Sequence, residues 1–399
     1  MSTETTDLTA GPAPAPDASG REVLLEVRGM KIDGFADEKW NPIIKGVDLT
    51  LHKGEVLGLI GESGAGKSTL GLAAMGFTRA GCRIAEGSVM FDGIDLLTAP
   101  ERKKRHLWGT RMTYVAQSAA ASFNPAHRLI EQTVAAAVRE GLKSEAEAVA
   151  DAKALYAALS LPDPDRIGER YPHQVSGGQL QRVMTAMAMS GRPDLIVFDE
   201  PTTALDVTTQ VEVLMSMRKI VDEFDTAAIY ITHDLAVVAQ MADRIKVLRY
   251  GEEVEEAPTR EMLEHPKEPY TRSLWSVRSL RKPAEASEDV VLSIQGVDAA
   301  YGNKVKVLHD VSIDLPRGRT VAIVGESGSG KSTTAKVITG LLPPTKGQIL
   351  FEGEPLPPEL KQRSKDQLRR IQMIYQMADT AMNPRQTVGE IIGRPLAFY

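Results

Sequence analysis

The sequence predicts an α/β fold with a mostly parallel sheet, present once as a whole domain and then begun a second time. The first observation is a long repeat: residues 54–69 (GEVLGLIGESGAGKST) recur as residues 318–333 (GRTVAIVGESGSGKST). A repeating unit of this length is a domain rather than a turn of a solenoid. The second observation is that short apolar runs alternate with helix-forming segments, which is typical of parallel strands joined by helices.

The core elements can be placed along the chain from these patterns. Residues 56–60 are a short apolar run followed by a helix-forming stretch, and residues 321–324 repeat this pattern in the second copy. Residues 195–198 and 228–232 are two further apolar runs of strand length. The Ala-rich stretch 132–159 predicts the helices of a smaller helical subdomain.

Composition limits the class of protein. The 399 residues are 42% hydrophobic and 25% charged, as in soluble globular proteins of two or three domains. No apolar stretch reaches the roughly 18 residues of a membrane-spanning helix, so any association with a membrane should be peripheral. A net charge of −6 with interspersed signs argues against a dedicated nucleic-acid-binding protein. The single cysteine, Cys82, excludes an internal disulfide and a cysteine-built metal cluster, and we expect a cytoplasmic protein.

Four segments are expected. Residues 1–20 lack the basic and apolar stretches of a secretory signal and predict a disordered tail. Residues 21–280 form the first domain, residues 281–289 (RKPAEASED) a linker, and residues 290–399 a second domain that matches only the front part of the first. We therefore expect a fragment of a longer protein, in which the second sheet is unfinished and an apolar face is exposed.

The segment after the first apolar run fits the phosphate-binding pattern G-x-x-x-x-G-K-[ST]. Glycines let backbone N–H groups face phosphate oxygens, and the helix that follows adds its positive N-terminal end. Lys67 would hold the β- and γ-phosphates, and Ser68 would offer its hydroxyl to Mg²⁺. The predicted nucleotide-binding residues are Gly61, Glu62, Ser63, Gly64, Ala65, Gly66, Lys67, Ser68 and Thr69, and in the second copy Gly325, Glu326, Ser327, Gly328, Ser329, Gly330, Lys331, Ser332 and Thr333.

Two adjacent acids and a histidine follow the other two apolar runs of the first domain. Asp199 and Glu200 come directly after residues 195–198, and His233 comes after residues 228–232. Asp199 would organise Mg²⁺, and Glu200 would act on the attacking water as a general base. His233 would hydrogen-bond the γ-phosphate and the same water. The phosphate-binding loop upstream favours these roles over solvated acids and a surface histidine.

Residues 171–182 (YPHQVSGGQLQR) place a Ser-Gly-Gly-Gln sequence at the start of an expected helix. This segment resembles the LSGGQ signature of ATP-binding-cassette (ABC) ATPases, with Val175 in place of the leucine. The other motifs of that family occur in the family's order. The resemblance implies a P-loop NTPase (ABC ATPase) cassette with ATP and Mg²⁺ as ligands. The signature residues are Ser176, Gly177, Gly178 and Gln179.

The resemblance also implies roles for residues outside these motifs. Gln117 and, in the second copy, Gln376 match the Q-loop glutamine, so Gln117 is placed with the catalytic residues Glu200 and His233. Asp206 matches the D-loop aspartate, and Tyr301 matches the aromatic residue that stacks on adenine. The candidates for that aromatic residue in the first domain are Phe35 and Trp40. The implied metal contacts are Ser68, Gln117, Asp199, Ser332 and Gln376.

Three short segments narrow the resemblance to ATPase subunits of peptide, dipeptide and nickel importers. They are residues 122–125 (SFNP), residues 171–173 (YPH) and residues 265–271 (HPKEPYT). Many of those subunits carry a cysteine-rich iron–sulfur segment after the Pro-Tyr-Thr motif, and this chain has no cysteine there, so we expect no cluster. The chain also differs after Gln117, where Ser-Ala-Ala replaces the usual acidic residue and proline.

The resemblance implies an ATPase that powers import of a peptide or similar small solute, peripheral to the cytoplasmic side of a bacterial inner membrane. Its implied partners are integral membrane permease subunits, a periplasmic solute-binding protein and a second ABC ATPase domain. The family binds ATP between the phosphate loop of one domain and the signature of another. Because the second copy has no signature, it would come from a missing half, a second chain or a partner subunit.

Two other functions stay open on the sequence. A soluble tandem-cassette ATPase acting on ribosomes or DNA would need a long charged linker, whereas residues 281–289 are short and of mixed charge. A non-hydrolysing regulatory module would bind ATP without turnover. The basic run 102–105 predicts a solvated helix face, and we expect no nucleic-acid partner.

Overall fold

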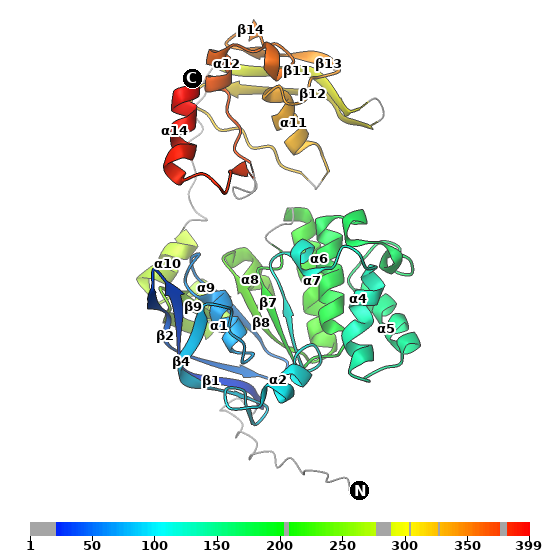
Figure 1. Ribbon diagram of the computed structural model, residues 1–399, viewed down its shortest axis with the longest axis vertical. Coiled ribbons are helices and arrows are strands. Elements are labelled where there is room, and N and C mark those ends of the chain that lie inside the picture. The colour runs from blue at the N-terminus through cyan, green and yellow to red at the C-terminus, as the bar shows by residue number, and fades with distance from the viewer. Residues whose placement is uncertain (1–20, 203–206, 277–288, 303–304, 326–327, 376–380) are drawn as a thin grey trace, which may run out of the picture. The chain divides into compact units, whose positions relative to one another are not determined.

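The protein, represented by a computed structural model, divides into two compact units, Met1–Leu280 and Arg281–Tyr399 (Figure 1). The structure describes residues 21–202, 207–276, 289–302, 305–325, 328–375 and 381–399. The expected tail 1–20 and nearly all of the expected linker 281–289 lie outside the described residues. The same holds for four expected site residues, Asp206, Glu326, Ser327 and Gln376.

A six-stranded sheet forms the centre of the first unit, in the order β10-β9-β3-β8-β7-β6. Its strands are β3 (Val56–Ile60), β6 (Met112–Val115), β7 (Leu195–Asp199), β8 (Ala227–Thr232), β9 (Arg244–Arg249) and β10 (Glu252–Pro258). The strands from β9 to β6 run parallel, and β10 pairs antiparallel with β9 at one edge. The predicted α/β fold with a mostly parallel sheet is confirmed, and the three apolar runs of the first domain are strands β3, β7 and β8.

A second sheet in this unit is antiparallel and was not predicted. It has the order β2-β1-β4-β5, and its two longest strands pair as a hairpin. Its strands alternate buried and exposed residues over much of their length, because one face packs on the core and the other faces solvent. Its bounds are β1 (Val23–Ala36), β2 (Lys39–His52), β4 (Cys82–Phe91) and β5 (Ile94–Asp95).

Helices surround the six-stranded sheet, and several of them form the predicted helical region (Figure 1). Helices α4, α5 and α6 contact one another, and α1 and α8 contact the central strands. Helix α5 begins with a capping box in which Ser144 and Glu147 satisfy each other's backbone N–H groups. The helices are α1 (Lys67–Ala73), α2 (Glu101–Leu107), α3 (Ala119–Ser122), α4 (Leu129–Arg139), α5 (Glu145–Ala158), α6 (Gly177–Met189), α7 (Val207–Glu223), α8 (Leu235–Met241), α9 (Thr259–Glu264) and α10 (Pro269–Ser276), with 3₁₀ turns at Ile167–Glu169 and Pro172–Gln174.

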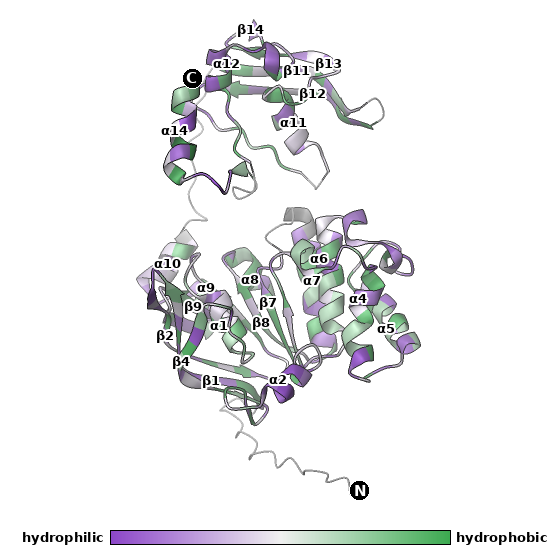
Figure 2. Cartoon of the chain, viewed as in Figure 1, coloured by the Kyte–Doolittle hydropathy of each residue, from purple (hydrophilic) through white to green (hydrophobic). Residues whose placement is uncertain are grey.

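Strand β3 carries the phosphate-binding loop and is buried on both faces. Val56 and Ile60 belong to a core shared with α6, α7 and α8, whereas Leu57 and Leu59 belong to a core shared with α1 and the antiparallel sheet. Side chains on a strand alternate between its faces, so this one strand joins the two cores. Gly58 allows close packing, since a Cβ there would meet the Val238 side chain at 2.2 Å. Figure 2 shows hydrophobic residues gathered on these central strands.

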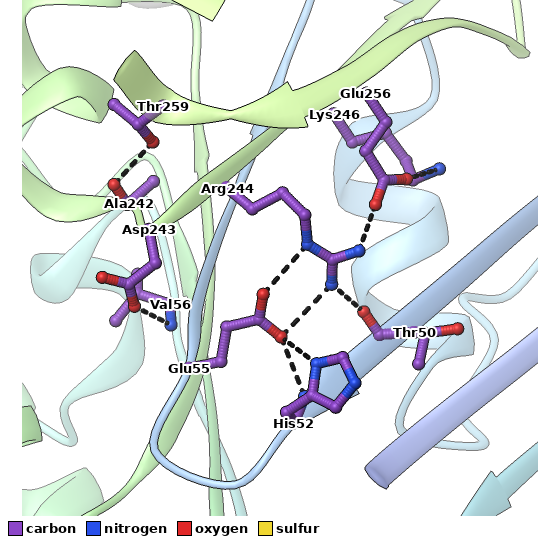
Figure 3. A network of polar contacts seen from close by, with 10 residues as sticks. All are labelled: Thr50, His52, Glu55, Val56, Ala242, Asp243, Arg244, Lys246, Glu256 and Thr259. Carbon is purple, nitrogen blue, oxygen red and sulfur yellow. Dashed lines mark hydrogen bonds and ion pairs between the residues drawn. The ribbon is translucent and has the colours of Figure 1, made fainter. Parts of the chain in front are cut away.

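A buried polar network fixes the start of β3 between the two sheets (Figure 3). The Arg244 guanidinium donates to the Glu55 carboxylate at 2.9 and 3.2 Å, to the Thr50 carbonyl at 2.5 Å, and to Glu256. The Glu55 carboxylate also accepts the His52 backbone N–H at 2.9 Å. Burial by itself raises the pKa of Glu55, but the bonds from Arg244 and His52 and the charge of Arg244 outweigh it and lower that pKa.

The second unit contains one antiparallel sheet, in the order β12-β11-β13-β14, with short helices. Helix α11 follows its phosphate-binding segment as α1 does in the first unit. The elements are β11 (Val290–Tyr301), β12 (Val305–Pro316), α11 (Lys331–Ile338), β13 (Lys346–Phe351), β14 (Glu354–Pro355), a 3₁₀ turn at Leu360–Gln362, α12 (Lys365–Arg370) and α14 (Val388–Phe398).

One expected strand of the second unit is absent from the structure. Residues 321–324 were predicted to repeat strand β3, but they have no regular secondary structure and are exposed, Val324 to 87%. In the first unit β3 is hydrogen-bonded by β8 on one side and β9 on the other. The described residues of the second unit include no counterpart of β8 or β9. An extended segment without neighbours has no ladder to join, so the apolar sequence alone does not make a strand.

No helix in the described part of the chain has both the length and the apolar content that crossing a membrane requires.

Candidate nucleotide-binding and hydrolysis site

The loop between β3 and α1 has a backbone conformation that depends on its glycines. Gly61, Gly64 and Gly66 have φ angles of 152°, 84° and 91°, which other residues rarely adopt. A Cβ on Gly61 would meet the Leu248 carbonyl oxygen at 2.1 Å, and one on Gly66 would meet the Ile44 side chain at 2.5 Å. Gly61 and Gly66 are therefore required because a side chain would clash there, as well as for their backbone conformation.

Lys67 folds back onto this loop. Its ammonium donates to the Gly61 carbonyl at 2.8 Å and to the Glu62 carbonyl at 2.9 Å, and the residue is only 6% exposed. Burial lowers the pKa of Lys67, against the charges of Glu200 and Asp199, which raise it. A buried cation beside two carboxylates and held by loop carbonyls is well placed to receive phosphate oxygens.

Asp199 ends β7, two strands away from β3 in the sheet, and its side chain reaches the residue after Lys67. The Ser68 hydroxyl donates to one of its carboxylate oxygens at 2.7 Å, and the Tyr114 hydroxyl donates to the other at 2.5 Å. Arg79 stands 3.7 Å from the second oxygen. Burial and the bond to Asp199 strongly raise the pKa of Tyr114, so the phenol keeps its proton and donates. The structure thus brings together the predicted residues Ser68 and Asp199.

Glu200 joins the other two predicted catalytic residues. Its carboxylate accepts from the Gln117 side-chain amide at 3.1 Å and lies 3.1 Å from His233 Nδ1. Glu200 has a positive φ of 47°, which is uncommon for a residue with a side chain and is found at turns and functional sites. Gln117 follows β6, and His233 follows β8, so three neighbouring parallel strands deliver the three side chains to the same edge of the sheet.

The oxygen-rich set at this edge fits Mg²⁺. A hydroxyl from Ser68, a carboxylate from Asp199 and an amide oxygen from Gln117 are the hard ligands that this ion prefers, with phosphate oxygens and water completing its shell. The described residues contain no group of three or more histidine, cysteine, aspartate and glutamate side chains that could hold a metal by themselves.

The signature residues open helix α6 as expected. Ser176 is the N-cap: its hydroxyl accepts the Gln179 backbone N–H at 3.3 Å, and the Gln179 side chain accepts the Ser176 N–H at 3.1 Å. A Cβ on Gly177 would meet nothing within 4 Å. The N-terminus of α6 is therefore open to an approaching group and has the positive end of a helix dipole.

The loop of the second unit has the same local geometry. Gly325, Gly328 and Gly330 have φ angles of 153°, 87° and 98°, and the Lys331 ammonium donates to the Gly325 carbonyl at 2.7 Å. Tyr301 lies at the end of β11 beside α11, where its hydroxyl is 3.5 Å from Thr333 Oγ1. In the first unit, Phe35 and Trp40 face each other across the β1–β2 hairpin.

Sequence reasoning missed two tyrosines at the first site. Tyr114 was not singled out, although it lies three residues before Gln117 in the same strand and loop. Tyr270 was noted only as part of the Pro-Tyr-Thr segment, yet its hydroxyl accepts the backbone N–H of Glu62 in the phosphate-binding loop at 3.3 Å. Neither contact has a signal in the local sequence, because its partner is distant in the chain.

Comparison with known proteins agrees with this geometry. A family model described as ABC transporter matches residues 44–203 and 308–394. The chain belongs to the ABC transporter ATPase family. This ABC ATPase is 32% identical over 420 residues to the glutathione import ATP-binding protein GsiA of Escherichia coli (strain K12), covering 94% of this chain and 67% of that protein. The protein of the same name from Salmonella choleraesuis (strain SC-B67) is 32% identical over 430 residues, covering 97% and 69%.

Solved structures place the ABC ATPase among known cassettes. The dimeric structure of the bacterial ABC transporter cassette MJ0796 aligns with a TM-score of 0.53 and 26% identity, covering 59% of this chain and 99% of the cassette. A post-hydrolysis state of MJ0796 bound to ADP and Pi aligns with a TM-score of 0.53 and 23% identity. The family's activity is hydrolysis of ATP coupled to transport, so this chain is an ATP-binding ATPase of that kind.

Proposed function

We propose that this ABC ATPase energises the import of peptides or similar small solutes, and that hydrolysis takes place at the site of the first unit. The observation that carries the site is a pair of contacts at one edge of the sheet: Asp199 accepts from Ser68 at the end of the phosphate-binding loop, and the neighbouring Glu200 bonds Gln117 and His233. The direction and the solute class are supported by the relatives named for glutathione import, since glutathione is a tripeptide.

Each side chain has a distinct task in this proposal. Backbone N–H groups of residues 61–69 and the Lys67 ammonium bind the phosphates, and Ser68, Asp199 and Gln117 hold Mg²⁺. Mg²⁺, when bound, neutralises charge on the phosphate oxygens. Glu200 accepts the proton of the attacking water, and its two hydrogen-bonded neighbours fix its carboxylate toward that water. His233 Nδ1 contacts Glu200, so its other ring nitrogen is available to the γ-phosphate.

The proposed site needs a second signature. Ser176 and the glycines after it open a helix whose N-terminus suits an anion, but they serve nucleotide held by another ATPase domain. The nucleotide at Lys67 therefore requires a signature from a further domain, whether in a longer chain, a second copy or a partner subunit. The loop at Lys331 is proposed as a second nucleotide-binding segment, in which Ser332, Thr333 and Tyr301 would also contact the nucleotide.

Permease subunits are the proposed partners of an apolar groove in the first unit. The groove has a volume of about 420 Å³ and lies where α1 ends, between β6 and helices α4 and α6. Aromatic and methionine side chains line it, with Phe77 43% exposed. The groove is lined both by β6, the strand before Gln117, and by helices α4 and α6 of the helical region. A bound permease segment would therefore contact both parts and respond to a change in their relative position. We further propose that the ATPase works on the cytoplasmic face of a bacterial inner membrane and that a periplasmic protein delivers the solute, as the relatives named for glutathione import support.

Uptake of labelled peptide tests this proposal. Cells lacking the chain are complemented with the parent protein, with Glu200→Gln, or with Glu264→Gln, an exposed acid on α9, and are given labelled glutathione and a panel of dipeptides and tripeptides. We expect the parent and Glu264→Gln to restore uptake of at least one peptide, and Glu200→Gln to restore none. If the parent hydrolyses ATP when purified but restores no peptide uptake, peptide import is wrong and the ATPase assignment stands.

A further inference from the structure

The Pro-Tyr-Thr segment near the end of the first unit reaches the phosphate-binding loop. The backbone N–H of Glu62 donates to the Tyr270 hydroxyl at 3.3 Å, between residues 208 positions apart in the chain. On its other side, the same residue offers its carbonyl to the Lys67 ammonium at 2.9 Å. One residue of the loop therefore connects Tyr270 to the lysine that receives phosphate.

Tyr270 is itself held from several directions. The Arg249 guanidinium, at the end of β9, lies 4.4 Å from the centre of the Tyr270 ring. The buried Glu255 carboxylate accepts the backbone N–H groups of Lys267 at 2.8 Å and Glu268 at 3.0 Å, which fixes the turn before α10. The ring also packs on the main hydrophobic core of the first unit. These contacts fix the position of the Tyr270 ring, and therefore of the hydroxyl that accepts the Glu62 N–H.

The backbone around Glu62 has a reason to need such support. A phosphate-binding loop works by presenting N–H groups in a fixed direction, and its glycines make it flexible. The Lys67 ammonium bonds to the carbonyls of Gly61 and Glu62 and must exchange them for phosphate oxygens when nucleotide arrives. Holding the Glu62 peptide in place reduces the ordering that binding would otherwise require.

We propose that Tyr270 is a positioning residue for the phosphate-binding loop, which acts on Lys67 through the Glu62 peptide. Its hydroxyl accepts the Glu62 backbone N–H and its ring lies against the Arg249 guanidinium, so its effect on nucleotide would pass through the loop. The proposal concerns nucleotide affinity and does not depend on which solute is carried.

The full chain offers a matched control for this test. Tyr250 also lies against Arg249, at 5.0 Å, but it is 65% exposed, and its hydroxyl has no hydrogen bond among the described residues. Tyr270→Phe and Tyr250→Phe each remove one hydroxyl and keep the ring beside the same guanidinium. All three proteins, the parent included, carry Lys331→Ala, so that calorimetric binding of ATP reports on the first loop.

We expect Tyr270→Phe to raise the ATP dissociation constant by about three- to tenfold, which corresponds to the loss of one hydrogen bond to a backbone amide. Tyr250→Phe should leave it within about 1.5-fold of the parent, since it loses no bond. Without nucleotide, amide hydrogen exchange over residues 57–66 should be faster in Tyr270→Phe only.

Three results would overturn the proposal. The first is an unchanged ATP dissociation constant in Tyr270→Phe. The second is an equal loss in Tyr250→Phe, which would assign the effect to the surroundings of Arg249 rather than to the bond with Glu62. The third is faster exchange across the whole first unit, since a merely structural role gives general loosening. If Tyr270→Phe lowers the melting midpoint, a gain in exchange confined to residues 57–66 still supports the positioning role.

Discussion

The two units begin with nearly the same sequence and differ in what surrounds it. Both form the phosphate-binding loop with three glycines at matching positive φ angles, and both close it with a side chain packed against the last glycine. Both also have an ion pair at matching positions: Arg111 with Asp92 at 2.7 Å, and Arg370 with Glu352 at 2.5 Å. Structure that depends on nearby sequence is therefore the same in the two copies.

The two copies differ where the first unit depends on strands β7, β8 and β9, which come later in its sequence. Leu59 and Val115 are fully buried in the first unit, whereas their counterparts Ile323 and Ile374 are 43% and 96% exposed in the second. The first pair lies in β3 and β6, which are held by β7, β8 and β9. The comparison teaches that a phosphate-binding loop forms from its own sequence, whereas the carboxylates beside it depend on strands that come more than a hundred residues later.

The largest expected effect concerns hydrolysis, because Asp199 and the proposed catalytic base Glu200 lie in the first unit, and the described residues of the second unit include no counterparts. Glu200→Gln should lower ATP turnover at least about a hundredfold while ATP still binds, since the amide cannot accept the proton of water. Lys67→Ala should lose more turnover than Lys331→Ala. Phosphate release, measured across protein concentrations, gives the turnover of the parent and of the Glu200→Gln, Lys67→Ala and Lys331→Ala variants.

Glu264→Gln is the control, because Glu264 is an exposed acid on α9 that pairs with Arg260. Turnover that rises with the square of concentration would mean that first units pair with each other. Hydrolysis that survives Glu200→Gln would contradict the assignment of Glu200 as the base and the conclusion that the first unit is the site of hydrolysis.

Core packing gives the next largest effect. Leu59→Ala should destabilise the first unit by about 2–5 kcal/mol, because it opens a cavity in a fully buried site. The matched Ile323→Ala should change the second unit by less than about 1 kcal/mol, since that side chain is half in solvent. Amide hydrogen exchange measures the stability of each unit separately, whereas a single denaturation curve combines the two units. Equal costs at the two positions would show that residues 321–324 are packed.

Acid should weaken the first unit through Glu55. Its lowered pKa means that its stabilising contribution is full above the ordinary value of 4.5 and is lost as the pH falls through the folded value. Glu55→Gln should cost about 2–4 kcal/mol at pH 7, because Arg244 loses a buried partner, and this difference from the parent should shrink below pH 4.5. Exchange measured from pH 7 to pH 3 tests the trend.

An acid of the second unit that offers a comparison is Glu352, whose pKa is lowered to about 2 by hydrogen bonds from Arg370 and Arg317. Because this cluster faces solvent, Glu352→Gln should have a smaller effect that fades at high salt. A larger loss for Glu352→Gln than for Glu55→Gln would reverse the comparison.

The smallest expected effect concerns Tyr114, whose counterpart in the second copy is Met373. Tyr114→Phe removes a hydrogen bond to Asp199 and should raise the Mg²⁺ concentration for half-maximal nucleotide binding by about threefold. Calorimetry at varied Mg²⁺ measures this. Tyr156→Phe is the control, since its hydroxyl bonds Thr133 in the helical region. An equal shift in both variants would assign the effect to general loosening.

The sequence alone determined the loops, the caps and the order of the motifs in this protein. The glycine spacing predicted a phosphate-binding loop, and Ser176 with the two glycines after it predicted a helix start, because each depends on residues a few positions apart. The residues that end β7 and β8 were also predicted, since strand ends of a parallel sheet meet at one edge.

Only the tertiary structure decided which of these local elements became a site. Ser68 meets Asp199 across 131 positions and Glu62 meets Tyr270 across 208, and no local pattern encodes either pairing. The apolar run at 56–60 is a strand because β8 and β9 supply its hydrogen-bond partners, and the similar run at 321–324 is not. A strand is a property of its neighbours as much as of its own residues, since its backbone groups need a ladder to be satisfied.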